Sequence, residues 1–177
     1  MGGLFGVSAY AKAPKRLLSL TLADSYATVG PAGPPRVAST RETLKTTSMR
    51  DFADDYVRDT LMPATPKPIY EATVDAIASV QPGNYLQTLE AILTADVTPH
   101  LGAIHAPTLV IVGANDQRTP VPVSEKLTAA IPGAQLLVLQ GAGHLSVLDK
   151  PEEFNSHLGQ FLKRQQDTKD NRKISKG

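Results

Sequence analysis

Two side chains in the sequence, Asp116 and His144, have the chemistry and the positions needed for acid–base catalysis. Each follows a short apolar run, 108–112 for the aspartate and 136–139 for the histidine, after a few small or polar residues. A carboxylate that accepts a hydrogen bond from an imidazole N–H fixes the tautomer of the ring and stabilises its protonated form. We therefore expect His144 to act as general base and acid, and Asp116 to orient it.

The other residues with catalytic or ligand chemistry are weaker candidates. His100 and His105 lie in the segment that leads to the 108–112 run, and His157 lies on a predicted helix, so each is expected at the surface or in ordinary packing. No His, Asp or Glu residues combine zinc-ligand spacing with a position at one strand end, and the sequence has no cysteine. We predict no metal site, no bound cofactor, no disulfide and no cysteine nucleophile.

Three apolar runs, 17–22, 108–112 and 136–139, are the expected strands. They are nearly continuous in apolar residues, which is typical of parallel strands buried on both faces. Between the second and third runs, apolar residues with helical spacing from Val123 onward predict a helix that stops at Pro132. Strand, helix and strand then form a right-handed crossover, and the carboxyl ends of its strands bring Asp116 and His144 to one edge of the sheet.

The rest of the chain divides by composition around this sheet. Residues 1–30 hold a helix-like segment and the first strand. The stretch 30–35, rich in Gly and Pro, predicts a loop, and helical patterns separated by prolines follow it, so that 31–102 is expected to be a helical insertion. Residues 103–164 hold the second and third strands, their loops and a closing helix. The polar, basic segment 165–177 is predicted to be a disordered tail.

Length and composition fit one globular domain. The 177 residues are 41% apolar and 20% charged, with a formal net charge of +1. A net charge so close to zero gives no reason to expect a nucleic acid or a membrane surface as partner. No apolar run approaches the roughly 20 residues that span a bilayer, and the first residues lack the basic region of a signal peptide. We expect a soluble, cytoplasmic protein, and the sequence leaves its oligomeric state open.

Two segments of the sequence resemble members of the α/β-hydrolase family. Residues 106–116 read APTLVIVGAND and are followed by Thr119-Pro120, which is similar to the strand and loop of the catalytic acid. Residues 141–144 read GAGH and are followed by LDKPEEF at 148–154, which is similar to the histidine loop and closing helix.

This resemblance implies a partial α/β-hydrolase fold with about three parallel strands, flanking helices and 31–102 as a helical cap. It also implies that Asp116 and His144 belong to a Ser–His–Asp triad, whose members follow the chain order Ser, acid, His. Within the family, 95–144 is most similar to 3-oxoadipate enol-lactonase-like members, which implies a small-molecule ester or lactone as substrate.

The family's nucleophile has no counterpart in the sequence. No G-x-S-x-G motif occurs, and residues 6–10 (GVSAY) lack its closing glycine. Met1-Gly2-Gly3 resembles the stretch that follows the serine in many members, so we expect the chain to begin one residue after its nucleophile. Met1 would then supply the first N–H of the oxyanion hole. Ser8, within a predicted helix, and Ser146, on the histidine loop, are poor substitutes.

The resemblance thus implies an ester or lactone hydrolase of which this chain is a portion that is inactive alone. Two alternatives stay open: a binding or regulatory fragment without catalysis, and haloperoxidase-like or C–C hydrolase chemistry on the same triad. The first strand would also form an open apolar edge, which predicts poor solubility or loose packing. Arg36, Arg41, Arg50 and Arg58 could meet a substrate carboxylate, but solvated helix faces carry such residues too, so the substrate is not identified.

Overall fold

Three parallel strands form the centre of the protein. The computed structural model describes the backbone of residues 1–174 and the side chains of residues 1–167. The strands are β1 (Leu20–Ala23), β2 (Thr108–Gly113) and β3 (Gln135–Leu139), in the order β1-β2-β3. Leu22 is aligned with Val110 and Val110 with Leu136, so the three carboxyl ends meet at one edge of the sheet. The prediction of a parallel sheet is confirmed.

β1 begins three residues later than its apolar run predicts. The first pair in the register joins Leu20 to Thr108, and the Leu20 N–H donates to the carbonyl of Pro107 (2.9 Å). Residues before Leu20 have no partner strand beside them, and Leu18 is 63% exposed. Within the described residues β1 is an edge of the sheet, although the side chains of Leu20 and Leu22 are buried. Poor solubility caused by this open edge stays a prediction.

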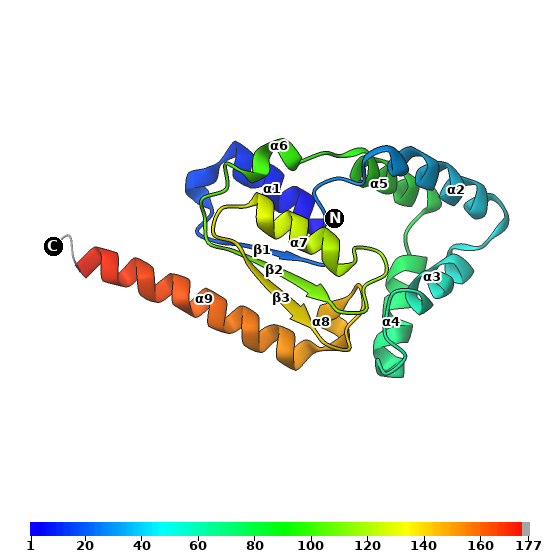
Figure 1. Ribbon diagram of the computed structural model, residues 1–177. Helices are drawn as coiled ribbons and strands as arrows, with labels where there is room; N and C mark the ends of the chain where they lie inside the picture. Colours follow the sequence, from blue (N-terminus) through cyan, green and yellow to red (C-terminus); the bar gives the residue numbers. More distant parts are fainter. Residues whose placement is uncertain (175–177) are drawn as a thin grey trace.

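Helices cover both faces of the sheet (Figure 1). α1 (Gly2–Lys12), α6 (Thr98–Leu101) and α7 (Val121–Ala130) pack on one face, and α9 (Pro151–Ile174) covers the other. Successive residues of a strand point to opposite faces, so Val110 packs with the first group whereas Leu109 and Ile111 pack beneath α9. Coverage on both faces is the arrangement that nearly continuous apolar strands predict.

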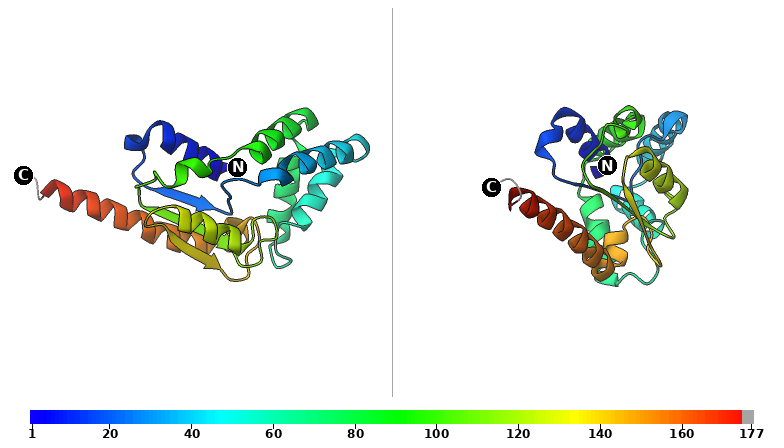
Figure 2. Two further views of the ribbon diagram at one scale, coloured as in Figure 1. Left: turned by 45° about the horizontal axis from the view of Figure 1, so that its top comes forward. Right: turned by 60° about the vertical axis from the view of Figure 1, so that its left-hand side comes forward.

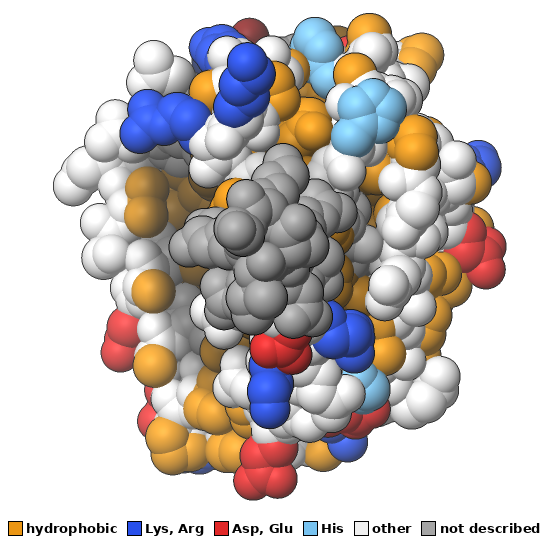
Figure 3. Space-filling view, turned by 90° about the vertical axis from the view of Figure 1, so that its left-hand side faces the viewer, with side chains coloured by type: hydrophobic (Ala, Val, Ile, Leu, Met, Phe, Trp, Pro, Cys, Tyr) orange, Lys and Arg blue, Asp and Glu red, His pale blue; other side chains and the backbone are white. Residues whose placement is uncertain are grey.

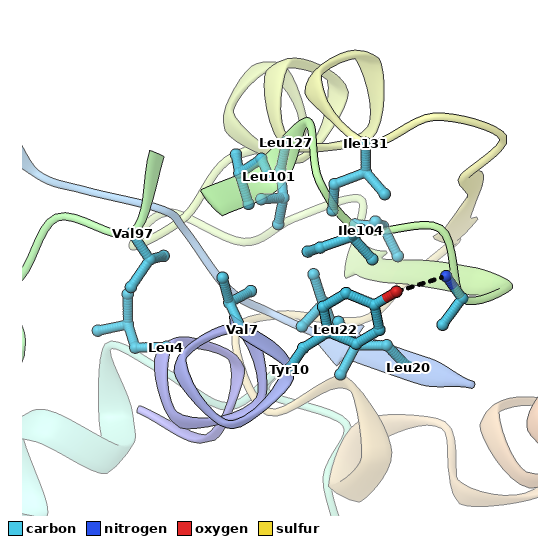
Figure 4. Close-up of a cluster of buried hydrophobic side chains, with 12 residues drawn as sticks. Leu4, Val7, Tyr10, Leu20, Leu22, Val97, Leu101, Ile104, Leu127 and Ile131 are labelled. Carbon is cyan, nitrogen blue, oxygen red and sulfur yellow. Dashed lines mark hydrogen bonds between the residues drawn. The ribbon is translucent and has the colours of Figure 1, made fainter. Parts of the chain in front are cut away.

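The larger hydrophobic cluster joins α1 to the sheet (Figure 4). Leu4, Val7 and Tyr10 recur at intervals of three residues along α1 and pack against the two buried leucines of β1. The hydroxyl of the buried Tyr10 accepts a hydrogen bond from the backbone N–H of Ala106 (3.2 Å), just before β2. Buried tyrosines usually need such a partner. The bond therefore fixes α1 to the strand that leads to Asp116.

The segment between β1 and β2 folds into helices, as predicted. Besides α6 it contains α2 (Gly33–Thr46), α3 (Met49–Arg58), α4 (Lys67–Ala78) and α5 (Pro82–Thr94). We call these four helices and their connections the cap. They lie beyond the carboxyl ends of the strands, with α3 beside α4 and α2 beside α5 (Figure 1, Figure 2). Val57 and Val74 of the cap share a cluster with Leu145 and Leu148. The cap thus packs directly on the loop that carries His144.

The stretch 30–35, predicted as a loop, begins a helix instead. Gly30–Ala32 forms one 3-10 turn, and α2 then carries Pro34 and Pro35 in its first turn, where their missing N–H groups cost no intrahelical hydrogen bond. A Cβ on Gly33 would lie 2.0 Å from the carbonyl oxygen of Leu93. Glycine at this position therefore allows α2 to approach the end of α5.

α9 continues to Ile174, where the sequence predicted a disordered tail from 165. Residues 160–174 contain neither Gly nor Pro and are rich in Gln, Lys and Arg, which favour helix. The end of α9 extends past the sheet (Figure 1), and Leu162 is 43% exposed. Figure 3 looks onto this side, where Lys and Arg gather at the upper edge and mix with Asp and Glu lower down. Residues 175–177 of the predicted tail lie outside the described residues.

The described helices differ in length and in apolar content. Within residues 1–174, none of them is both long enough and apolar enough to cross a membrane.

Candidate active site

Asp116 and His144 meet at the carboxyl ends of β2 and β3, as their positions in the sequence predict. Oδ2 of Asp116 lies 2.9 Å from Nδ1 of His144. The Asp116 side chain is fully buried, whereas 19% of the His144 side chain is exposed. Because Nδ1 faces the carboxylate, Nε2 is the ring nitrogen left for a reacting group. The arrangement suits a histidine base whose tautomer is fixed by a buried acid.

Hydrogen-bond donors around Asp116 keep it ionised. Its Oδ1 accepts from the backbone N–H groups of Arg118 and Thr119 (both 2.8 Å), and its Oδ2 accepts from the Thr119 hydroxyl (2.6 Å). Burial raises the pKa of Asp116, but the hydrogen bonds from His144 and Thr119 outweigh burial and lower that pKa to about 2. The carboxylate beside His144 is therefore ionised at neutral pH.

Two glycines allow the acid loop and the histidine loop to touch. A Cβ on Gly113, the last residue of β2, would lie 2.2 Å from the carbonyl oxygen of Gly143 and 2.4 Å from that of Ala142. A Cβ on Gly143 would lie 2.6 Å from the carbonyl oxygen of Thr60 in the cap. Neither glycine has a positive φ, so space rather than backbone conformation requires them. The distance between Asp116 and the histidine loop depends on both.

The cap is hydrogen-bonded to the histidine loop through Thr60 and Asp149. The carbonyl of Thr60 accepts from the backbone N–H of His144 (3.1 Å). Asp149, which ends the short helix α8 (Ser146–Asp149), accepts at Oδ2 from the N–H of the residue before His144 (2.7 Å) and at Oδ1 from the N–H of Met62 (3.1 Å). The backbone of His144 is thus held from both sides. Neither role could be predicted from the sequence, because the contacts of Thr60 with His144 and of Asp149 with Met62 join residues far apart in the chain.

A second carboxylate at the strand ends, Asp24, is absent from the sequence prediction. Its Oδ2 accepts from the backbone N–H (3.0 Å) and the hydroxyl (2.7 Å) of Ser146, and its Oδ1 accepts from the N–H of Gly113 (3.3 Å). Its φ of 46° is uncommon for a residue other than glycine. Burial raises the pKa of Asp24 to about 6, against the effect of the hydrogen bonds from Ser146. Asp24 directly follows β1, so the position at a strand end that made Asp116 a candidate applies to Asp24 as well.

A cavity of about 470 Å³ opens beside the Asp116–His144 pair. Its lining includes His144, Thr119, Asp24, Met1 and Arg118. The surrounding aromatic and aliphatic side chains are Tyr26, Tyr56, Tyr85, Ile77, Leu89 and Ile92. A volume in the range of roughly 300–1,000 Å³, with apolar walls and a few convergent polar groups, is typical of small-molecule sites.

Met1 lies at this cavity, and neither candidate serine is placed to act as a nucleophile there. Burial lowers the pKa of the Met1 α-amino group. Ser146 is fully buried and its hydroxyl donates to Asp24, while Ser8 lies on α1 and does not line the cavity. Among the described side chains, no group of three or more His, Cys, Asp and Glu could hold a metal ion.

Comparison with known proteins identifies the family. The sequence pattern of the alpha/beta hydrolase fold matches residues 1–151. The chain therefore belongs to the α/β-hydrolase family, and its parallel strands, covering helices and cap are part of that fold. The resemblance predicted from the acid and histidine loops is confirmed.

Individual relatives agree with this assignment. 3-Oxoadipate enol-lactonase 2 of Acinetobacter baylyi is 30% identical over 171 residues, which are 93% of this chain and 61% of that protein. A Pseudomonas savastanoi protein named as a carbamate hydrolase, RutD, is 30% identical over 174 residues, 93% of this chain and 66% of that protein. The enol-lactonase structure from Burkholderia xenovorans LB400 has a TM-score of 0.81 at 27% identity, over 92% of this chain and 63% of that one. The chain spans less than two thirds of the length of each.

Proposed function

We propose that this chain carries the general base, the orienting acid and the substrate cap of a hydrolase that cleaves an ester or a lactone. The observation that carries the proposal is the 2.9 Å hydrogen bond between a fully buried Asp116 and His144 at the wall of a cavity. Two relatives, by name a lactonase and a carbamate hydrolase, support it. Lactones and carbamates, like esters, are cleaved by attack on a carbonyl carbon.

The first half of the proposed mechanism transfers the acyl group to a serine that precedes Met1 in a longer chain. Nε2 of His144 removes the serine proton as the serine oxygen bonds to the substrate's carbonyl carbon. Asp116, kept ionised by its lowered pKa, stabilises the imidazolium that results. Nε2 then returns the proton to the leaving alkoxide oxygen as the bond between that oxygen and the carbonyl carbon breaks.

The second half releases the acid. A water molecule gives a proton to Nε2 of His144 while its oxygen attacks the acyl carbonyl, and the proton passes to the serine oxygen as the new carboxylic acid leaves. In a longer chain the nitrogen of Met1 is part of a peptide bond, and its N–H would donate to the oxyanion in both halves. With a lactone, the leaving oxygen and the new carboxyl group stay in one product molecule.

Three features support a nucleophile placed before Met1. The sequence contains no G-x-S-x-G motif. Met1 lines the same cavity as His144, so a residue bonded to the nitrogen of Met1 would begin close to the base. The start of α1 is also packed tightly on the end of β1, because a Cβ on Gly3 would lie 2.0 Å from the hydroxyl of Ser25.

A fluorophosphonate probe, which reacts with a serine activated by a histidine base, tests the proposal. The 177-residue chain should not be labelled, whereas a chain extended upstream through a G-x-S-x-G serine should be. In the extended chain His144→Gln should abolish labelling, and His100→Gln, at an exposed histidine, should leave it unchanged. Labelling of the 177-residue chain at Ser8 or Ser146 would overturn the proposal. An extended chain that binds esters without labelling or hydrolysis would instead support a binding module.

A further inference from the structure

One wall of the cavity carries an arginine whose charge has no acidic partner among residues 1–167, whose side chains the structure describes. Arg118 follows Asp116 by two residues, is partly buried and lines the cavity together with His144. The basic side chains found in ion pairs with Asp or Glu among the described residues are Arg41, Lys45, Arg50, Arg58, Lys67 and His144. The guanidinium of Arg118 is not among them.

The cap holds this guanidinium in a defined orientation. Nε of Arg118 donates to the Thr60 hydroxyl (2.8 Å), and Nη2 donates to the carbonyl of Tyr56 (3.4 Å). Cζ lies 3.8 Å from the centroid of the Tyr56 ring. The ring face and the two neutral oxygens offset the cost of partial burial without neutralising the charge. Two of the five N–H groups of the guanidinium are engaged in these hydrogen bonds. The other three have no acceptor among the described residues and can meet a planar carboxylate.

Thr60 links the arginine to the proposed base. Its hydroxyl accepts from Arg118, and its carbonyl accepts from the backbone N–H of His144 (3.1 Å). Thr60 is only 3% exposed, so this link is well shielded from water. A group bound to Arg118 is therefore positioned relative to His144 through a single buried residue.

The other polar groups at the cavity also favour an anion. Arg36 lines the cavity as a second cation. Burial raises the pKa of Tyr85 to about 12, so its hydroxyl keeps its proton and can donate. Asp24 has the opposite charge, but its oxygens already accept hydrogen bonds from Ser146 and Gly113. Between these polar groups, the aliphatic walls suit a short hydrocarbon chain.

We propose that Arg118 is a specificity residue that binds a carboxylate of the substrate. The favoured substrate is an ester or lactone with a carboxylate joined to the scissile carbonyl by a short aliphatic chain. That the cleaved bond belongs to an ester or a lactone rests on the proposed function above. Binding of the carboxylate requires no serine and can be measured separately.

An NMR titration of the 177-residue chain with monomethyl glutarate, and with dimethyl glutarate as its uncharged counterpart, tests this subsite. The monoester should bind roughly tenfold more tightly or better, because hydrogen bonds between charged groups are the stronger ones, and should shift the signals of Arg118 and Tyr56. Arg118→Gln should remove the preference. Arg118→Lys should keep part of it, since lysine retains the charge without the planar fork. Arg41→Gln removes the same charge outside the cavity lining and should leave binding unchanged.

Three results would overturn the subsite. They are equal affinity of wild type for the two esters, unchanged selectivity in an Arg118→Gln chain with the dispersed amide signals of a folded protein, and methyl phosphate binding as tightly as the monoester. The subsite and the proposed function can also fail separately. Selective binding by a chain that hydrolyses no ester after upstream extension supports the subsite and removes the function. Hydrolysis of both esters by the extended chain with equal kcat/KM supports the function and removes the subsite.

Discussion

Asp116 and Asp24 follow neighbouring strands of the sheet, yet their surroundings shift their pKa values in opposite directions. Both lie at the carboxyl edge, Asp116 after β2 and Asp24 after β1, and Asp116 is the more deeply buried. Burial raises the pKa of each carboxyl group. The pKa of Asp116 nevertheless falls to about 2, whereas that of Asp24 rises to about 6.

The difference lies in the donors that each loop supplies. The loop after Asp116 turns back, so that the N–H groups of Arg118 and Thr119 and the Thr119 hydroxyl all reach the carboxylate, and His144 adds a fourth contact. Asp24 receives two hydrogen bonds from Ser146 and a longer one from the neighbouring strand, and the charge of Asp116 raises its pKa further. A strand-end carboxylate becomes the ionised partner of a base only where such donors surround it.

The largest effect should be on kcat, which substitution of Asp116 should lower far more than substitution of Asp24. In a chain extended upstream through a G-x-S-x-G serine, Asp116→Asn should lower kcat by about 10⁴-fold, the size of effect known for losing the acid of a serine–histidine triad. Asp24→Asn should cost less than about tenfold, because Asp24 contacts Ser146 rather than the imidazole. Steady-state hydrolysis of a simple ester at pH 8 measures both. Equal losses in the two variants would mean that Asp24 shares the role assigned to Asp116.

The next largest effect should be on the way the free energy of unfolding changes with pH. The folded-state pKa of Asp24, about 6, exceeds its ordinary value of 3.8, so between these values the folded chain holds more protons and the free energy of unfolding falls as pH rises. The fall should be up to about 3 kcal/mol. Asp116 changes the free energy of unfolding with pH in the opposite direction. Its folded-state pKa is about 2, so its stabilisation, about 2 kcal/mol, is complete above pH 4 and is lost as pH falls towards 2.

Urea unfolding from pH 2 to 8 measures both contributions. Asp24→Asn should remove the loss of stability between about pH 4 and 6, while Asp116→Asn should leave that loss in place. Asp59→Asn is a matched control, because Asp59 is exposed at the end of α3. An Asp24→Asn chain that loses stability over this pH range as steeply as wild type would remove the contrast between the two strand ends.

The parts of the molecule that follow from local pattern could be predicted from the sequence. Continuous apolar runs gave the parallel sheet, helical spacing gave α7 and the cap helices, and strand ends brought Asp116 to His144. Local patterns gave a wrong prediction where one residue type fits two kinds of structure. The prolines at 34 and 35 read as a loop, although a first helical turn accepts them.

The contacts that hold the site could not be predicted in this way, because they join residues far apart in the chain. Thr60 lies 58 residues from Arg118, and Asp149 lies 87 residues from Met62. Arg118 itself stood beside a predicted acid, but only the folded cap shows that its guanidinium is oriented by Tyr56 and has no acidic partner in the described part of the chain. Such properties depend on three-dimensional packing and leave no periodic signal in the sequence.

The smallest effect should come from a substitution of Gly113, which approaches the histidine loop and donates its N–H to Asp24. Gly113→Ala places a Cβ 2.2 Å from the carbonyl of Gly143, on the strand end whose N–H donates to Asp24. Overpacking of this kind should cost about 1–3 kcal/mol and displace the histidine loop. Gly159→Ala, on an open face of α9, should stabilise by about 0.5–1 kcal/mol. Urea unfolding gives both values, and NMR of the Nδ1–H of His144 reports the contact with Asp116. If Gly113→Ala preserved that signal and the stability of wild type, the close approach of the two loops would not be what sets the Asp116–His144 geometry.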